Sequence, residues 1–173
     1  RFHEGINSIM EVLNFLESTA VATWVRESLS LWAFPTMIAL HAIGMAVLVG
    51  LNVAICLLLL SSKPRAPMAS VLTFFRFIWL ALAVNVVSGT LLLMANATEL
   101  LVLPVFYIKI LFVILSVIVL LKLQQGVATE VNYADADLSQ KRLRILSVMC
   151  LSTWMIALVA GRLTAYPMLL FGH

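Results

Sequence analysis

The sequence predicts an all-α integral membrane protein, a four-helix transmembrane bundle preceded by an amphipathic interfacial helix. Of its 173 residues, 63% are hydrophobic and only 11% are charged, whereas soluble domains carry about 25% charged residues. Four apolar runs are each long enough to cross the hydrocarbon core of about 30 Å. The runs lack the alternation of barrel strands, and only helices or closed barrels satisfy the backbone in lipid. The runs are therefore expected to be helices.

Residues 1–27 are predicted to form the amphipathic helix. Glu4, Glu11 and Glu17 make this segment too polar to span and unlike the apolar region of a signal peptide, so it is expected to stay in the mature chain. It is expected to lie along the outer surface, over the bundle mouth, or on a partner subunit. Its apolar side recurs at helical spacing: Ile6, Ile9, Met10, Leu13, Leu16, Ala20 and Trp24.

Residues 28–173 are predicted to form the bundle. The first run has no Asp, Glu, Lys or Arg from Ser28 to Ser62, and prolines Pro67 and Pro104 stand where later helices are expected to begin. The polar stretch 124–140 is expected to be the longest soluble connection. The expected spans are about 29–61, 70–96, 103–123 and 142–166.

The distribution of charge predicts the orientation in the membrane. Basic residues gather in the two connections on one side, whereas Glu4, Glu11, Glu17, Glu27 and Glu99 fall on the other. By the positive-inside rule, the basic side is cytoplasmic. We therefore expect a multi-pass protein of the bacterial inner membrane with both termini on the periplasmic side. The basic residues are Lys63, Arg65, Arg76, Lys122, Lys141, Arg142 and Arg144.

Composition also argues against several functions. A net charge of +3 from eleven basic and eight acidic residues is too small for a nucleic-acid surface. Cys56 and Cys150 lie in apolar runs, where a thiol behaves as a small hydrophobe. The sequence shows no set of nucleophile, base and acid, so we expect no catalytic activity of its own.

Five residues are candidates for a binding site: His41, Lys109, Arg162, Tyr107 and Tyr166. The predicted topology brings them to the outer level of the membrane on three different helices. Polar groups inside spans are costly and mark functional sites by default, which indicates a pocket for haem propionates, a quinone head group or a lipid phosphate. The alternative is that Lys109 and Arg162 extend to lipid head groups while the tyrosines form an aromatic belt.

His41 faces the bundle on the predicted helix, where Met37, Met45, Leu48 and Asn52 share its side. The imidazole is a candidate axial ligand of haem b, but a bis-histidine site needs a second one. The other candidates for that ligand are His3, His173, Met37, Met45 and Met168. A structural histidine bonded across helices explains the residue equally well.

Mild polar groups in the second and fourth spans are expected to hydrogen-bond across helices around Gly89. These groups are Asn85, Ser88, Thr90, Ser152 and Thr153.

Several short segments resemble an uncharacterised family of bacterial four-span membrane proteins, known only as a domain of unknown function. The resemblance covers nearly the whole chain and includes the candidate site residues His41, Lys109, Arg162 and Tyr166, but it implies no activity. The chain departs from the family at Cys56 and the leucines after it, where a basic Arg-Leu-Leu-Gly-like end is expected. The matching segments are Val25 to Ser28, Leu40 to Gly44, Val49 and Gly50, Gly89, Phe106 to Lys109, Ser152, Trp154, and Gly161 to Tyr166.

These observations lead to one main hypothesis and two alternatives. The main hypothesis is a non-catalytic or electron-transfer membrane subunit of a larger respiratory or redox complex, with an outer-leaflet pocket around His41 for haem or quinone. The first alternative is a structural anchor or scaffold whose polar residues contact lipid and partner chains. A solute carrier is disfavoured because the spans lack carboxylates and broken helices.

Overall fold

A computed structural model of the chain describes residues 2–27, 32–61, 68–132 and 136–164. Within these ranges every element is a helix, and four helices are long and apolar enough to cross a membrane. The predicted all-α class and the four spans are therefore confirmed, and the chain has the fold of a multi-pass membrane protein. The helices are α1 (Phe2–Glu17), α2 (Ala20–Glu27), α3 (Phe34–Leu60), α4 (Met68–Ala95), α5 (Ala97–Leu100), α6 (Pro104–Asn132) and α7 (Ala136–Leu163).

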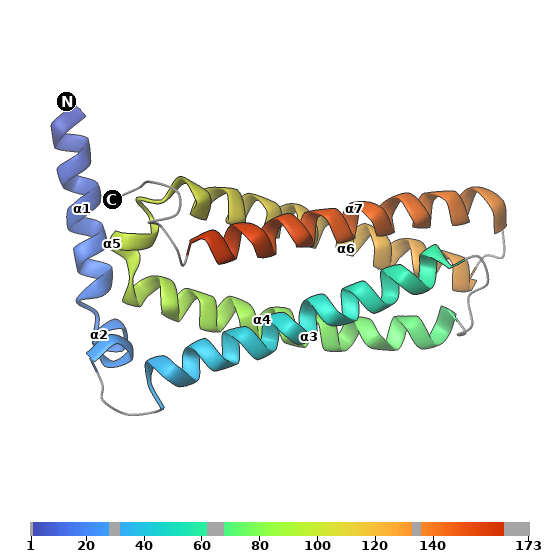
Figure 1. Ribbon diagram of the computed structural model, residues 1–173, viewed down its shortest axis with the longest axis horizontal. Coiled ribbons are helices and arrows are strands. Elements are labelled where there is room, and N and C mark those ends of the chain that lie inside the picture. The colour runs from blue at the N-terminus through green and yellow to red at the C-terminus, as the bar shows by residue number, and fades with distance from the viewer. Residues whose placement is uncertain (1, 28–31, 62–67, 133–135, 165–173) are drawn as a thin grey trace.

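The four long helices form an up-and-down bundle (Figure 1). Helix α3 packs on α4 and α6 packs on α7, while contacts of α3 with α7 and of α4 with α6 close the bundle. Large apolar side chains cover its outside, including Ile43, Val87 and Ile145, each more than 60% exposed. Such a surface suits lipid rather than water.

The tightest part of the core lies in one half of the bundle. Its buried side chains come from the second halves of α3 and α6 and the first halves of α4 and α7. In the other half, near α5, the helices enclose a cavity that is described below. We call this the α5 end. The buried core includes Cys56, Leu59, Val71, Phe75, Ile78, Leu120, Leu123, Val127, Leu143, Leu146 and Cys150.

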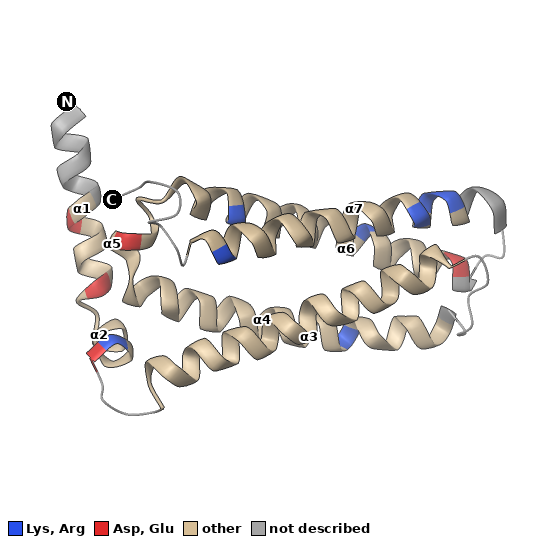
Figure 2. Cartoon of the chain, viewed as in Figure 1, with Lys and Arg blue, Asp and Glu red and all other residues tan. Residues whose placement is uncertain are grey.

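Helices α6 and α7 continue through most of the stretch 124–140, which hydropathy had marked as a soluble connection. They have 29 and 28 residues, and at about 1.5 Å per residue they exceed the hydrocarbon thickness. Val127 and Leu143 are buried where the two helices pack beyond the apolar runs. Packing between helices, rather than lipid, thus extends them. Lysines and arginines of α7 lie at this end (Figure 2).

The lead-in segment is two helices rather than the single one expected. Ser18 and Thr19 separate them because their hydroxyls donate to the carbonyls of Phe15 and Leu16, both at 2.8 Å. The Thr19 oxygen also accepts from the backbone N–H of Ala22 at 3.4 Å. Side-chain bonds of this kind end one helix and cap the next.

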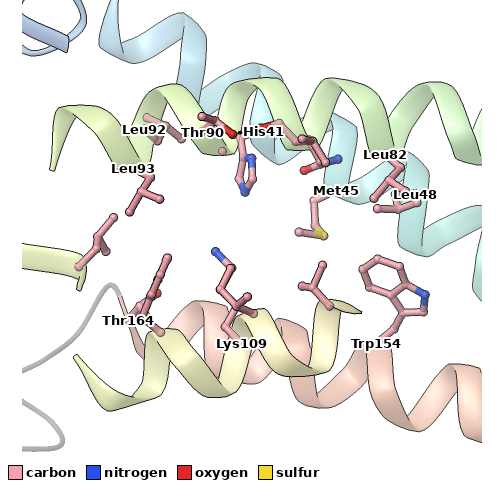
Figure 3. Close-up of a pocket in the computed structure, with 17 residues that line it drawn as sticks. His41, Met45, Leu48, Leu82, Thr90, Leu92, Leu93, Lys109, Trp154 and Thr164 are labelled. Carbon is pink, nitrogen blue, oxygen red and sulfur yellow. Dashed lines mark hydrogen bonds between the residues drawn. The ribbon is translucent and has the colours of Figure 1, made fainter. Parts of the chain in front are cut away.

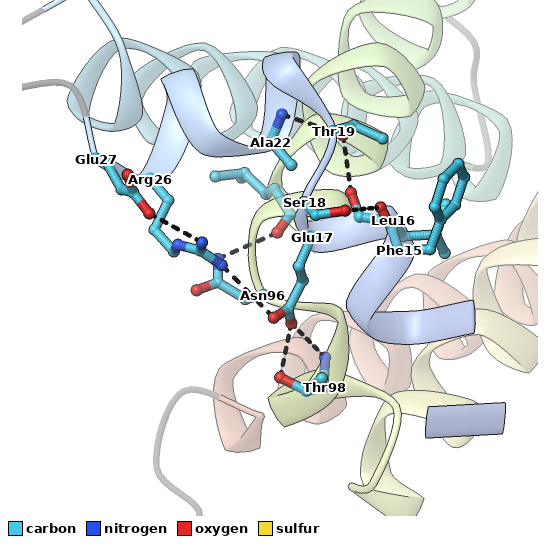
Figure 4. A network of polar contacts seen from close by, with 11 residues as sticks. Phe15, Leu16, Glu17, Ser18, Thr19, Ala22, Arg26, Glu27, Asn96 and Thr98 are labelled. Carbon is cyan, nitrogen blue, oxygen red and sulfur yellow. Dashed lines mark hydrogen bonds and ion pairs between the residues drawn. The ribbon is translucent and has the colours of Figure 1, made fainter. Parts of the chain in front are cut away.

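The lead-in helices pack across the α5 end of the bundle, with α1 against α4 and α5 and α2 against α4 (Figure 1). The Glu17 carboxylate accepts from the Thr98 backbone N–H at 2.7 Å and from its hydroxyl at 2.6 Å. Arg26 lies 3.5 Å from Glu17 and 3.1 Å from Glu27, as Figure 4 shows. The expected position over the bundle mouth is thus realised through α5.

The predicted apolar face of the lead-in segment is only partly covered. Leu13 is buried, as are Ala22 and Val25 in α2. Met10 and Trp24, predicted on the same side as Leu13, are 41% and 48% exposed. Because the helix breaks at Ser18 and Thr19, Trp24 of α2 does not continue the helical face of Leu13 in α1.

Candidate functional site

A cavity of about 360 Å³ lies between the long helices at the α5 end. Its wall is almost wholly apolar, and its polar groups come chiefly from α3, α4 and α6 (Figure 3). Pockets that bind small molecules typically combine an apolar wall with a few placed polar groups. The lining residues are His41, Met45, Leu48, Leu82, Asn85, Val86, Gly89, Thr90, Leu92, Leu93, Leu100, Phe106, Lys109, Ile110, Val113, Trp154 and Thr164.

The half-buried His41 enters the cavity from α3, one turn before Met45. Its Nδ1 lies 3.1 Å from the Ser88 hydroxyl on α4. That hydroxyl is also 2.7 Å from the Val84 carbonyl, to which it must donate its single proton. Ser88 therefore accepts from His41 Nδ1–H, and in the neutral ring Nε2 carries the free lone pair. The expected bond across helices is confirmed for this pair.

Gly89 allows the imidazole to lie directly on α4. A Cβ atom at this position would stand 3.1 Å from His41 Cε1 and 3.5 Å from Nδ1. A larger residue would push the ring away from Ser88. The glycine therefore belongs to the site, although it contributes no side chain.

Lys109 enters from α6 on the opposite wall, and its side chain points across the cavity toward His41 (Figure 3). Its stem passes over Gly161 of α7, with Cε 3.5 Å and Cδ 3.6 Å from the position of a Cβ there. Within the part of the chain that the structure describes, no hydrogen bond or ion pair joins Lys109 to another residue. Its amine is thus available to an oxygen atom in the cavity.

Asn85 places an amide on the α4 wall and is 6% exposed. Its Nδ2 donates to the Ala81 carbonyl at 2.9 Å, which fixes the direction of the amide. The same nitrogen is 2.6 Å from the position of a Cβ at Gly44. Among the described residues, Asn85 Oδ1 has no hydrogen-bond donor. A buried acceptor without a partner is costly and calls for an explanation.

Two other predicted site residues, Arg162 and Tyr107, do not line this cavity. Arg162 is exposed on the last turn of α7 and does not line the cavity. Tyr107 is 57% exposed and donates to the Leu101 carbonyl at 2.9 Å, as an aromatic-belt residue would. Its neighbour Phe106 lines the cavity instead. Tyr166 lies outside the described residues.

Several lining residues were not expected in the site. Asn85 and Ser88 were predicted only as contacts between helices, and buried Trp154 forms a wall near Leu48 and Leu82 (Figure 3). The expected bonds of Ser152 and Thr153 between helices run instead to carbonyls of their own helix. Trp154 follows Cys150 by one helical turn, and this spacing is the one sequence signal for its inward position.

The cavity opens sideways between α4 and α6. Three of its lining residues, Val86, Thr90 and Ile110, are also exposed on the outer surface of the bundle. This surface is the apolar one that faces lipid. A ligand with a long apolar tail could therefore keep its head group beside His41 while the tail leaves through this opening.

The cavity fits haem less well than it fits a ligand with a long apolar tail. Met45 is one turn from His41 on the same wall, whereas two axial ligands must approach the ring from opposite faces. The structure does not describe the side chains of His3, Met168 and His173. Among the described residues, no three His, Cys, Asp or Glu gather as a metal site.

Comparison with family models, with curated proteins and with solved structures gave no match for this chain.

Proposed function

We propose that this protein is a membrane subunit of a larger respiratory or redox complex and binds a quinone-type electron carrier in the cavity around His41. The observation that carries the proposal is the pair formed by His41 and Lys109 on opposite walls of an apolar cavity between spanning helices. A quinone head group is a flat apolar ring with an oxygen at each end. The Lys109 wall would donate to one oxygen, and the His41 wall would face the other.

The opening between α4 and α6 supports a quinone over other ligands. Quinones carry long apolar tails and reach their sites from within the bilayer, and the opening is lined by exposed Val86 and Ile110. Because a binding pocket alone does not pass electrons onward, the proposal places the electron-carrying group on a partner subunit. The resemblance to an uncharacterised four-span family stays a prediction.

The proposal includes the orientation expected from charge. The α5 end, with Glu17, Glu27 and Glu99, would face the periplasm, and the end with Lys141 and Arg144 would face the cytoplasm of a bacterial cell. His41 lies seven residues after the start of α3 at Phe34, or roughly 10 Å along the helix axis. The quinone would then bind in the outer leaflet.

The test is the quinone content of the purified protein. The wild type, His41→Leu and the control Thr90→Val would be isolated from native membranes in mild detergent, and their quinone extracted and measured per mole of protein. Thr90 also lines the cavity, but its hydroxyl already donates to the Val86 carbonyl at 2.8 Å. We expect nearly one quinone per chain in the wild type and in Thr90→Val, and a severalfold loss in His41→Leu.

Two results would contradict the proposal. Equal quinone content in the wild type and His41→Leu would mean that the quinone is bulk lipid, which leaves the anchor or scaffold function. A visible spectrum with a Soret band that disappears in His41→Leu would instead assign the cavity to haem.

A further inference from the structure

We infer that the cavity binds the reduced hydroquinone in preference to the oxidised quinone. This inference rests on the proposed function and deepens it, because it assigns the redox form of the ligand. It comes from the direction of the hydrogen bonds on the α3 and α4 wall. A quinone carbonyl only accepts hydrogen bonds, whereas each hydroxyl of a hydroquinone both donates and accepts.

The α3 wall offers an acceptor. Ser88 gives its proton to the Val84 carbonyl at 2.7 Å and so accepts from His41 Nδ1–H, which leaves Nε2 as an acceptor in the neutral ring. His41 lines the cavity and is only half-buried, so this acceptor can reach a ligand there.

The opposite wall offers a donor. The Lys109 ammonium group has three N–H donors and no acceptor, and no described residue engages it in a hydrogen bond or ion pair. It suits an oxygen of either redox form, because a carbonyl and a hydroxyl oxygen both accept. Lys109 therefore holds one end of the ring without selecting between the two forms.

The two redox forms are distinguished at the end of the ligand ring that faces His41. A hydroquinone hydroxyl donates to Nε2, whereas a quinone carbonyl there would place two lone pairs against each other. A mismatched buried pair of this kind should weaken binding of the oxidised form about tenfold.

The experiment compares the two redox forms directly. Wild type, His41→Gln and the control Gly50→Ala, which lies outside the cavity wall and where a Cβ meets no atom within 4 Å, would be placed in lipid nanodiscs. Each would be titrated calorimetrically with a short-chain substituted benzoquinone and, under argon, with its hydroquinone. We expect the wild type and the control to bind the hydroquinone about tenfold more tightly. In His41→Gln the amide can turn an N–H toward a carbonyl oxygen, so the two affinities should differ by about twofold or less.

Each result separates the two proposals. Equal wild-type affinities, or a preference kept in His41→Gln, would overturn the assignment of redox form while the quinone site stands. Failure of both forms to bind the wild type would overturn the proposed function itself. Circular dichroism of each variant shows whether it is folded. Ser88→Ala provides a second test, because the imidazole is then free to carry its proton on Nε2 and the preference for hydroquinone should shrink.

Discussion

The His41 imidazole packs on the backbone of α4 at Gly89, with Cε1 3.1 Å from the point where a Cβ at position 89 would lie. This contact places Nδ1 within reach of Ser88 one residue earlier in the chain. The position of the ring therefore depends on the absence of a side chain as much as on the hydrogen bond.

Gly89→Ala should displace His41 without unfolding the bundle. The added methyl group is too close to a ring atom, so the bond to Ser88 should lengthen and quinone content should fall severalfold. In a helix, Ala is otherwise favoured over Gly by roughly 1 kcal/mol. Gly50→Ala is the matched control, because a Cβ there meets no atom within 4 Å. Quinone loss of the same size in both variants would contradict this role of Gly89.

Gly44→Ala should destabilise the bundle more than Gly89→Ala. A Cβ at Gly44 would lie 2.6 Å from Asn85 Nδ2, which is held by the Ala81 carbonyl. Either the amide turns or α3 and α4 separate. Such overpacking typically lowers stability by about 1–3 kcal/mol. Thermal unfolding in detergent measures the effect, again beside Gly50→Ala. An unchanged midpoint for Gly44→Ala would show that the two helices have room at this point.

Glu17→Gln should release the lead-in helices from the α5 end. The Thr98 hydroxyl, its backbone N–H and Arg26 hold the pKa of the Glu17 carboxyl below its usual range. Because this pKa is lowered in the docked state, docking is fully stabilised above the ordinary Glu value of about 4.3 and weakens as the pH falls through the lowered value. A spin label at exposed Asn14→Cys would report the release as increased mobility.

The mobility of the spin label should depend on the Glu17 carboxylate and not on that of Glu27. Labelled wild type should be immobile at pH 7 and become mobile below about pH 4, whereas labelled Glu17→Gln should be mobile at both. Glu27 is the matched control, since its side chain is 61% exposed and pairs with Arg26 at 3.1 Å. If Glu27→Gln released the label as much as Glu17→Gln, the contact with Thr98 would not be what holds the helices.

Single cysteines test the orientation of the bundle. Val102, 70% exposed at the α5 end, and Gln140, exposed at the other end, would each be changed to Cys. A reagent that does not cross membranes should label Val102→Cys but not Gln140→Cys in cells whose outer membrane is permeabilised. Buried Cys56 and Cys150 add little background. The reverse labelling pattern would refute the orientation inferred from the basic residues.

Hydropathy and charge predicted the helical class, the number of spans and the shared level of His41 and Lys109, because these follow from lengths and positions along the chain. The same reasoning placed Arg162 and Tyr107 in the site, but the structure turns them to the outer surface. The depth of a residue in the membrane can be predicted from the number of residues between it and the end of its span. The direction of its side chain depends on how the helices are rotated against one another.

The parts that sequence reasoning missed all depend on contacts between helices. Asn85 is a buried acceptor only because Gly44 lets α3 approach it. The extension of α6 and α7 depends on residues such as Val127 and Leu143, which are buried against other helices. The break at Ser18 and Thr19 had a local signal, since two adjacent hydroxyl residues often end one helix and cap another.

The central claim is that a quinone binds inside the bundle, and the fluorescence of Trp154 tests it most directly. Trp154 lines the cavity, whereas Trp79 bonds Gln124 at 2.8 Å and lies outside the cavity wall. Two variants that keep only Trp154 or only Trp79 would be titrated with a short-chain quinone, which quenches tryptophan on contact. The account predicts saturable quenching of Trp154, lost in His41→Leu, and only weak linear quenching of Trp79. Equal, linear quenching of both tryptophans would contradict it.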